Sequence, residues 1–150
     1  MEIPAPFGRL TTAMITPFQK DGEVDWSGVE KLATHLVSNG HDGLVLNGTT
    51  GEAPTTSDDE KDEIIKVVRK AVGSKIKIIA GAGNNETSHS VEQAKRAAKA
   101  GADALLVVTP YYNKPPQAGV IAHFTAMADA TDAQKTQLKE DFRQAGINLN

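Results

Sequence analysis

Short apolar runs alternate with longer segments of helical periodicity along the first 131 residues. The runs are apolar on both faces, which is typical of strands buried in a parallel sheet. In the segments between them, apolar positions recur every three or four residues, as they do on the buried face of a helix. The predicted strands are residues 10–16, 43–46, 76–80 and 104–108, and the predicted helices are 25–39, 57–72, 88–100 and 120–128.

Residues at the ends of these segments support the helix assignments. Asp25 is a suitable N-cap for the first helix, and Gly40 is placed to end it. Ser57 and Glu60 have the spacing of a capping box at the start of the second helix. Residues 40–45 are similar to residues 101–106, and in this internal repeat the end of a helix is followed by the start of a strand in both copies. The pattern therefore predicts four βα units.

Strands of this kind, alternating with helices, require a parallel sheet covered by helices. An open α/β sandwich and part of a (β/α)₈ TIM barrel both fit. A complete barrel usually needs about 250 residues, so four units correspond to half of one. The predicted fold class is α/β, a partial barrel of four βα units over residues 1–131.

Residues 132–150 follow a different pattern. No strand is predicted there, and Leu138, Phe142 and Ala145 form an apolar stripe on a mostly polar segment. Gly146 is placed to end such a helix. We expect an extra C-terminal amphipathic helix, and we do not expect a fifth βα unit.

Composition narrows the possible functions. The chain has 150 residues, 39% of them hydrophobic and 23% charged, with a net charge of −3. No basic cluster is present, which argues against partners such as nucleic acid or an anionic membrane. With no cysteine, disulfides and thiolate metal sites are excluded. Residues 1–10 lack the apolar core of a secretory signal, so a cytoplasmic location is expected.

Two loops follow predicted strands and carry hydroxyl groups. The first, the threonine turn (residues 48–52), reads Gly-Thr-Thr-Gly-Glu. It lacks the Gly-Lys-Ser/Thr ending of a nucleotide P-loop, and it suits a carboxylate or carbonyl oxygen better than a triphosphate. A tight βα turn with no ligand is the alternative.

The second loop, the tyrosine loop (residues 109–115), reads Thr-Pro-Tyr-Tyr-Asn-Lys-Pro. Two adjacent tyrosines cannot both enter the same core, so at least one phenol is expected at a cleft or at a neighbouring chain. A third segment, residues 81–86, has glutamate where a dinucleotide fingerprint needs its third glycine. There we expect a turn with asparagine in a left-handed conformation.

Five segments together resemble the dihydrodipicolinate synthase (4-hydroxy-tetrahydrodipicolinate synthase) family of pyruvate-dependent class I aldolases and lyases. The resemblance runs from about residue 7 to residue 131. It is carried by residues 16–18, 39–44, 48–52, 79–83 and 109–115.

The resemblance implies a (β/α)₈ barrel that condenses pyruvate with L-aspartate 4-semialdehyde in lysine (diaminopimelate) biosynthesis. Pyruvate would form a Schiff base with a lysine, without a metal or another cofactor. By position, Thr49 is similar to the relay threonine, and Thr50 with Gly48 to the carboxylate-binding residues. Tyr112 is similar to a relay tyrosine inserted from a neighbouring subunit, which implies a homo-oligomer. Tyr111 and Asn85 are similar to residues of a lysine-feedback site or interface.

The chain departs from this family pattern after Thr131. In the family a fifth strand then carries another relay tyrosine and a sixth carries the Schiff-base lysine, and neither is found here. Residues 138–146 instead resemble the final helix of the family. The lysines of this chain fall on predicted helices, turns or termini, except Lys75 and Lys77 at the start of the third strand, the wrong end of a barrel.

Three functional hypotheses follow from that departure. In the first, the chain keeps half of the site and is inactive alone. In the second, another lysine or a partner chain supplies the nucleophile. In the third, the chain is a non-catalytic fragment that associates with itself or with a full-length homologue. The segment after the threonine turn also departs from the pattern of lysine-inhibited members, so feedback inhibition is not expected.

Overall fold

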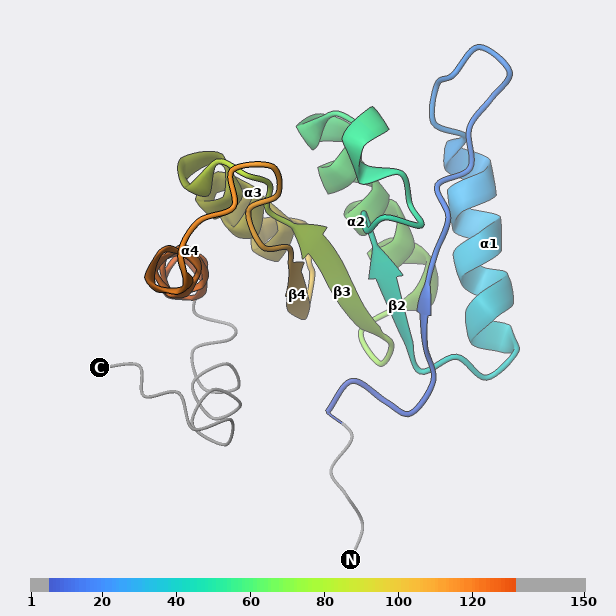
Figure 1. Ribbon diagram of the computed structural model, residues 1–150. Coiled ribbons are helices and arrows are strands. Elements are labelled where there is room, and N and C mark those ends of the chain that lie inside the picture. Colours follow the sequence, from blue (N-terminus) through green and yellow to red (C-terminus); the bar gives the residue numbers. More distant parts are fainter. Residues whose placement is uncertain (1–5, 132–150) are drawn as a thin grey trace, which may run out of the picture.

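Four parallel strands form the centre of the molecule in the computed structural model, which describes residues 6–131. They are β1 (Thr11–Ala13), β2 (Gly43–Leu46), β3 (Lys77–Ala82) and β4 (Ala104–Val107). Their order in the sheet is β1-β2-β3-β4, the order of the sequence (Figure 1). The α/β class and the four βα units are thus confirmed. The helix expected over residues 132–150 lies outside the described residues.

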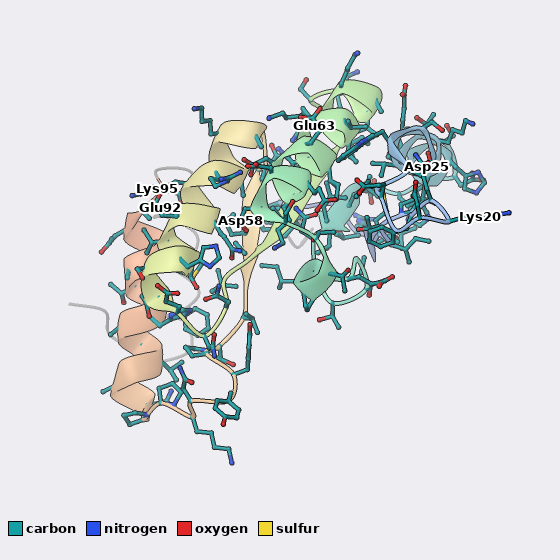
Figure 2. The ribbon with its side chains drawn as sticks, turned by 90° about the horizontal axis from the view of Figure 1, so that it is seen from above. Lys20, Asp25, Asp58, Glu63, Glu92 and Lys95 are labelled. Atoms are coloured by element: carbon teal, nitrogen blue, oxygen red, sulfur yellow. The ribbon has the colours of Figure 1, made fainter. Side chains whose placement is uncertain are left out.

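A helix follows each strand, and consecutive helices contact one another. The helices are α1 (Trp26–Ser38), α2 (Asp58–Val72), α3 (Thr87–Ala100) and α4 (Gln117–Asp129), with a short 3₁₀ turn η1 (Ala53–Thr55) before α2. α1 contacts α2, α2 contacts α3, and α3 contacts α4. The helices lie along one side of the sheet (Figures 1 and 2). None of the helices between residues 6 and 131 has the length and apolar character that a bilayer crossing needs.

The predicted helix caps are confirmed. The Asp25 carboxylate accepts a hydrogen bond from the Gly28 N–H at 3.0 Å. Ser57 and Glu60 form a reciprocal capping box at the start of α2. Gly40 has a φ of 90° and Gly101 a φ of 110°, the left-handed conformation that favours glycine at helix ends.

The internal repeat contains an aspartate in each copy, and the structure shows what these two aspartates do. Asp42 precedes β2, and its carboxylate accepts hydrogen bonds from the Arg9 and Leu10 N–H groups at 2.9 and 3.0 Å. Asp103 occupies the same place before β4 and accepts from the Ile78 N–H at 2.8 Å. Each carboxylate therefore anchors the beginning of the preceding strand. The N–H groups of Leu10 and Arg9 hold the pKa of Asp42 below its usual value.

Several predicted boundaries were wrong. β1 is shorter than expected and ends at Ala13, before a segment in which Thr16 bonds to the threonine turn. β3 runs two residues further than expected, because Gly81 and Ala82 pair with Leu106 and Val107 of β4. α4 begins at Gln117, three residues early, directly after a proline N-cap.

The two faces of the sheet differ sharply in burial. Strand residues on the helix-covered face are fully buried against apolar residues of α1 and α2. The strand side of this core is formed by Met14, Leu44, Leu46, Ile78 and Ala80, and the helix side includes Val29, Ala33, Ile64, Ile65 and Val68. Burial of this apolar area is the main source of stability for such a layered fold.

The opposite face of the sheet is apolar and, as far as residues 6–131 show, only partly covered. Ala13, Val45, Ile79 and Ala104 are partners in the strand register and therefore share this face. Of these, Ala13 is exposed, Val45 and Ile79 are half-buried, and Ala104 is buried. Leu106, two residues beyond Ala104, is 53% exposed. β1 and β4 are also edge strands with no neighbour on one side within the described residues. An apolar face with two open edges favours association.

We therefore expect the 150-residue chain to associate in solution. Two copies bring eight strands, which is the number that closes a barrel filled by side chains. Leu106→Glu places a charge on the uncovered face and should weaken association about tenfold or more. Ser38→Lys, at the exposed end of α1, is the matched control. Size-exclusion chromatography with light scattering measures the effect, and a stable, folded wild-type monomer would contradict the expectation.

Candidate functional site

The loops that follow the four strands gather at one edge of the sheet (Figure 1). This edge is formed by the C-terminal ends of the parallel strands, where α/β proteins commonly place their ligand sites. The threonine turn follows β2 there, and the tyrosine loop follows β4. The sequence prediction therefore located both loops correctly.

The threonine turn is a closed backbone structure with its hydroxyls on the outside. The Glu52 N–H donates to the Thr49 carbonyl at 3.1 Å, and the Ala53 N–H donates to the Gly48 carbonyl at 3.2 Å. The side chains of Thr49 and Thr50 are exposed. Within residues 6–131 neither hydroxyl has a hydrogen-bond partner. Both can therefore donate to an oxygen of a bound carboxylate or carbonyl group.

The residues on either side of the turn are fixed more firmly. Asn47 is 4% exposed and has a left-handed φ of 56°. Its side-chain Nδ2 donates to the Lys61 carbonyl of α2 at 3.1 Å. On the other side, the buried Thr16 hydroxyl donates to the Gly51 carbonyl at 2.7 Å. The contacts of Asn47 and of the Thr16 hydroxyl could not be predicted from the sequence, because neither contact is local.

The tyrosine loop exposes both of its phenols. Tyr111 is 55% exposed and Tyr112 is 90% exposed. Tyr112 also has a left-handed φ of 67°, which a bulky residue rarely adopts and which stores backbone strain at this position. So large an exposed area is unusual for an aromatic side chain, and it is consistent with the expectation of a phenol presented to a cleft or a neighbouring chain.

Asn85 lies beside the tyrosine loop. The Asn113 side chain donates to the Asn85 carbonyl at 3.1 Å, which joins the loop after β3 to the loop after β4. Asn85 and Tyr111 are thus brought to neighbouring loops, whereas no hydrogen bond described in the structure joins the tyrosine loop to the threonine turn. The expected left-handed asparagine was wrong: Gly83, with a φ of 102°, makes that turn.

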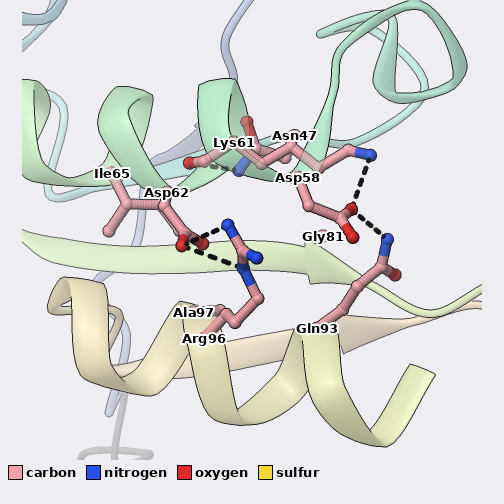
Figure 3. Close-up of a pocket in the computed structure, with 9 residues that line it drawn as sticks. All are labelled: Asn47, Asp58, Lys61, Asp62, Ile65, Gly81, Gln93, Arg96 and Ala97. Atoms are coloured by element: carbon pink, nitrogen blue, oxygen red, sulfur yellow. Dashed lines mark hydrogen bonds and ion pairs between the residues drawn. The ribbon is translucent and has the colours of Figure 1, made fainter. Parts of the chain in front are cut away.

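Charged and polar side chains join α2 to α3 (Figures 2 and 3). We call them the interhelical cluster, which consists of Asp58, Asp62, His89, Gln93 and Arg96. Asp58 lies at its centre and accepts hydrogen bonds from His89 Nε2 at 2.6 Å and Gln93 Nε2 at 2.9 Å. One turn further along α2, Asp62 accepts from Arg96 of α3 at 2.9 Å. These pairs flank a small cavity lined by Asn47, Asp58, Lys61, Asp62, Ile65, Gly81, Gln93, Arg96 and Ala97.

His89 links the interhelical cluster to the loop after β3. Its Nδ1 accepts a hydrogen bond from the Asn84 side chain at 2.8 Å, while its Nε2 donates to Asp58. Burial raises the pKa of Asp58, but the hydrogen bonds from His89 and Gln93 outweigh it and lower the pKa to about 2. The pair of His89 and Asp58 could not be predicted from the sequence, because the two residues are 31 positions apart.

Lys77 lies away from the edge that carries the loops, whereas Lys61 lies in the first turns of α2 near that edge. Lys77 begins β3, at the opposite end of the strand, and its ammonium is 3.8 Å from Asp103. Lys61 lies on the outer helix layer, 3.6 Å from Asp58. Among the described residues, the prediction that the strand lysines lie at the wrong end is confirmed for Lys77.

Comparisons with known proteins agree with this architecture. Residues 6–137 match the model of the "Dihydrodipicolinate synthetase family". The 4-hydroxy-tetrahydrodipicolinate synthase of Acidothermus cellulolyticus is 60% identical over 128 residues, covering 85% of this chain and 42% of the relative. The crystal structure of the enzyme from Cyanidioschyzon merolae with lysine bound superimposes with a TM-score of 0.81 at 49% identity, over 85% of this chain and 43% of that one.

A third relative was solved with a small ligand. The structure of the chloride-inhibited dihydrodipicolinate synthase from Acinetobacter baumannii, complexed with pyruvate, has a TM-score of 0.80 and 45% identity over 82% of this chain and 42% of that one. This chain therefore spans less than half the length of the relatives it matches. Those neighbours are TIM barrels, and the four βα units described here are part of such a barrel.

The low pKa of Asp58 makes a prediction about acid stability. A carboxylate whose pKa is lower in the folded than in the unfolded chain stabilises the fold above the unfolded value of 3.8, and this contribution disappears as the pH falls toward about 2. Asp58→Asn should therefore lose less unfolding free energy than the wild type between about pH 5 and pH 2. The expected difference is on the order of 1 kcal/mol, after allowance for the partly exposed carboxylate.

Urea denaturation at a series of pH values measures this difference. Glu63→Gln, an exposed residue of the same helix, is the control and should keep the wild-type pH dependence. Equal acid sensitivity in Asp58→Asn and the wild type would show that the hydrogen bonds from His89 and Gln93 do not stabilise the charged form of Asp58.

Proposed function

The chain belongs to the dihydrodipicolinate synthetase family, and on that basis we propose that it supplies the carboxylate-binding half of a lyase site. The reaction is the condensation of pyruvate with L-aspartate 4-semialdehyde. The observation that supports this most is the threonine turn, which is closed by its own backbone and leaves two hydroxyls free at the ligand-binding edge. A relative at 45% identity was solved complexed with pyruvate.

In this proposal the threonine turn holds the carboxylate of pyruvate. Gly48 and Thr50 bind its oxygens, because a glycine leaves the backbone accessible and a threonine adds a hydroxyl donor. Thr49 and Tyr112 relay a proton during condensation. The 90% exposure of Tyr112 suits a phenol that completes its role in the site of a neighbouring subunit. Tyr111 and Asn85 lie on adjoining loops and form part of a regulatory site or of the subunit interface.

In this proposal neither Lys77 nor Lys61 supplies the nucleophile. A Schiff-base lysine must be desolvated and have a lowered pKa within the site. Lys77 lies at the opposite end of its strand beside Asp103, and Lys61 is paired with Asp58 on the helix layer. We therefore propose that the 150-residue chain is inactive by itself and that another polypeptide segment or chain supplies the lysine.

A second candidate is a non-catalytic module that associates with itself or with a full-length homologue. It is favoured by the uncovered apolar face, on which Ile15 and Leu106 are 55% and 53% exposed. In this case the tyrosine loop serves as contact surface rather than as catalyst. Stable co-purification with a full-length homologue, without gain of activity over that homologue alone, would favour the second candidate.

Pyruvate binding to the threonine turn tests the first candidate. A few hydrogen bonds, each worth about 1 kcal/mol net, predict a dissociation constant around the millimolar range without covalent capture. Titration with pyruvate should shift the backbone amide resonances of Thr49 and Thr50 in NMR spectra. The Thr49→Val, Thr50→Val double variant keeps the side-chain shape, loses both hydroxyls, and should not respond. No shift at tens of millimolar, roughly ten times the expected constant, would contradict the proposal.

A further inference from the structure

Three elements distant in sequence hold the threonine turn in place. From the segment that follows β1, Thr16 donates its hydroxyl to the Gly51 carbonyl at 2.7 Å. From α2, the Lys61 carbonyl accepts the Asn47 side-chain amide at 3.1 Å. From β3, Gly81 packs directly on the Asn47 backbone, where an added Cβ would lie only 2.1 Å from the Asn47 carbonyl oxygen. The turn is thus fixed on three sides by groups that are not part of it.

The fit around Gly51 is similarly close. A Cβ at this position would lie 3.1 Å from the Met14 carbonyl oxygen and 3.4 Å from the Thr16 hydroxyl. Gly51 is therefore pressed against the end of β1, and the Thr16 hydroxyl satisfies a carbonyl that would otherwise be buried without a partner. At the other end of the turn, Asn47 tolerates the left-handed φ of 56° better than most residues, and its buried side chain prevents the turn from rotating.

We propose that Thr16 and Asn47 are positioning residues, which hold the threonine turn so that the Thr49 and Thr50 hydroxyls point outward together. Neither residue touches the substrate in this scheme. Their effect on a ligand rests on the proposed function above, whereas their effect on the turn itself does not. Donors that are ordered before binding lose less conformational entropy when a ligand binds, so less binding free energy is spent on ordering them.

Thr16→Val and Thr16→Ser form the matched test of this role. Valine keeps the shape and the β-branch of threonine but loses the hydroxyl, whereas serine keeps the hydroxyl. Backbone order parameters of residues 48–51, measured by NMR relaxation without ligand, should be near the rigid value of about 0.85 in the wild type. They should fall toward about 0.6 in Thr16→Val and return in Thr16→Ser. Asn47→Gly keeps the left-handed backbone, loses the bond to Lys61, and should loosen the turn likewise.

A general loss of stability must be distinguished from a local loss of rigidity in the threonine turn. Val68→Ala opens a cavity in the hydrophobic core, about two turns along α2 from Lys61, and lowers stability without touching the turn. It should lower the urea midpoint and leave the order parameters of residues 48–51 unchanged. If Val68→Ala lowers them as Thr16→Val does, the effect is one of general stability and the positioning role is overturned.

Pyruvate titration of the same variants gives the second measurement. Binding at the threonine turn should weaken about threefold to tenfold in Thr16→Val and in Asn47→Gly, and be restored in Thr16→Ser. Failure of the wild type to bind pyruvate would contradict the proposed function, while the order parameters would still decide the positioning role. Order parameters at the wild-type value in both Thr16→Val and Asn47→Gly would overturn the positioning role, whatever the pyruvate result.

Discussion

The parallel direction of all four strands is the constraint on which the rest of this structure depends. Because each strand must start again from the same edge, the chain returns through a helix after every strand. The returning helices pack on one face of the sheet and form the core there with Leu44, Leu46 and Ile78. The same constraint gathers the loops after the strands at a single edge. Because the strands also lie in the order of the sequence, crossovers of one hand place the helices on one face, and among the described residues Ala13 and Leu106 are exposed on the other. The site and the apolar surface therefore have a common origin.

The two hydroxyl-bearing loops at this edge are built differently. The threonine turn is held by buried contacts from β3, α2 and the segment after β1, and its two threonine side chains are exposed. The tyrosine loop is joined to its surroundings by the bond between Asn113 and Asn85, and it carries strain at Tyr112. This difference is consistent with the proposed roles, in which the threonine turn binds substrate within the chain and the tyrosine loop contacts another chain.

Features that depend on neighbouring residues could be predicted from the sequence. Asp25 and Ser57 cap helices because their side chains reach backbone N–H groups three residues away. Gly40 and Gly101 end helices because their backbone conformation needs no partner. The alternation of apolar runs and helical stripes was sufficient for the order of the elements and for the edge at which the site lies.

Features that depend on distant residues could not be predicted in this way. β3 extends to Ala82 because Gly81 and Ala82 pair with β4. Residue 81 must be a glycine because the Asn47 carbonyl packs against it, a fit between residues 34 positions apart in the sequence. The pairing of His89 with Asp58 and of Thr16 with Gly51 joins residues more than 30 positions apart. A hydroxyl or an imidazole has several possible partners, and only the packed fold selects one of them. The roles of Thr49, Thr50 and Tyr112 came from the family resemblance and not from periodicity.

We propose that this chain holds a prepared carboxylate site without the lysine that would capture pyruvate covalently. Borohydride reduction in the presence of pyruvate, followed by intact-mass and peptide mass spectrometry, tests it most directly, with a full-length relative as the positive control. We predict a reduced pyruvate adduct on the relative and none on the 150-residue chain. A stoichiometric adduct on any lysine of this chain, abolished by substitution of that lysine, would contradict the claim.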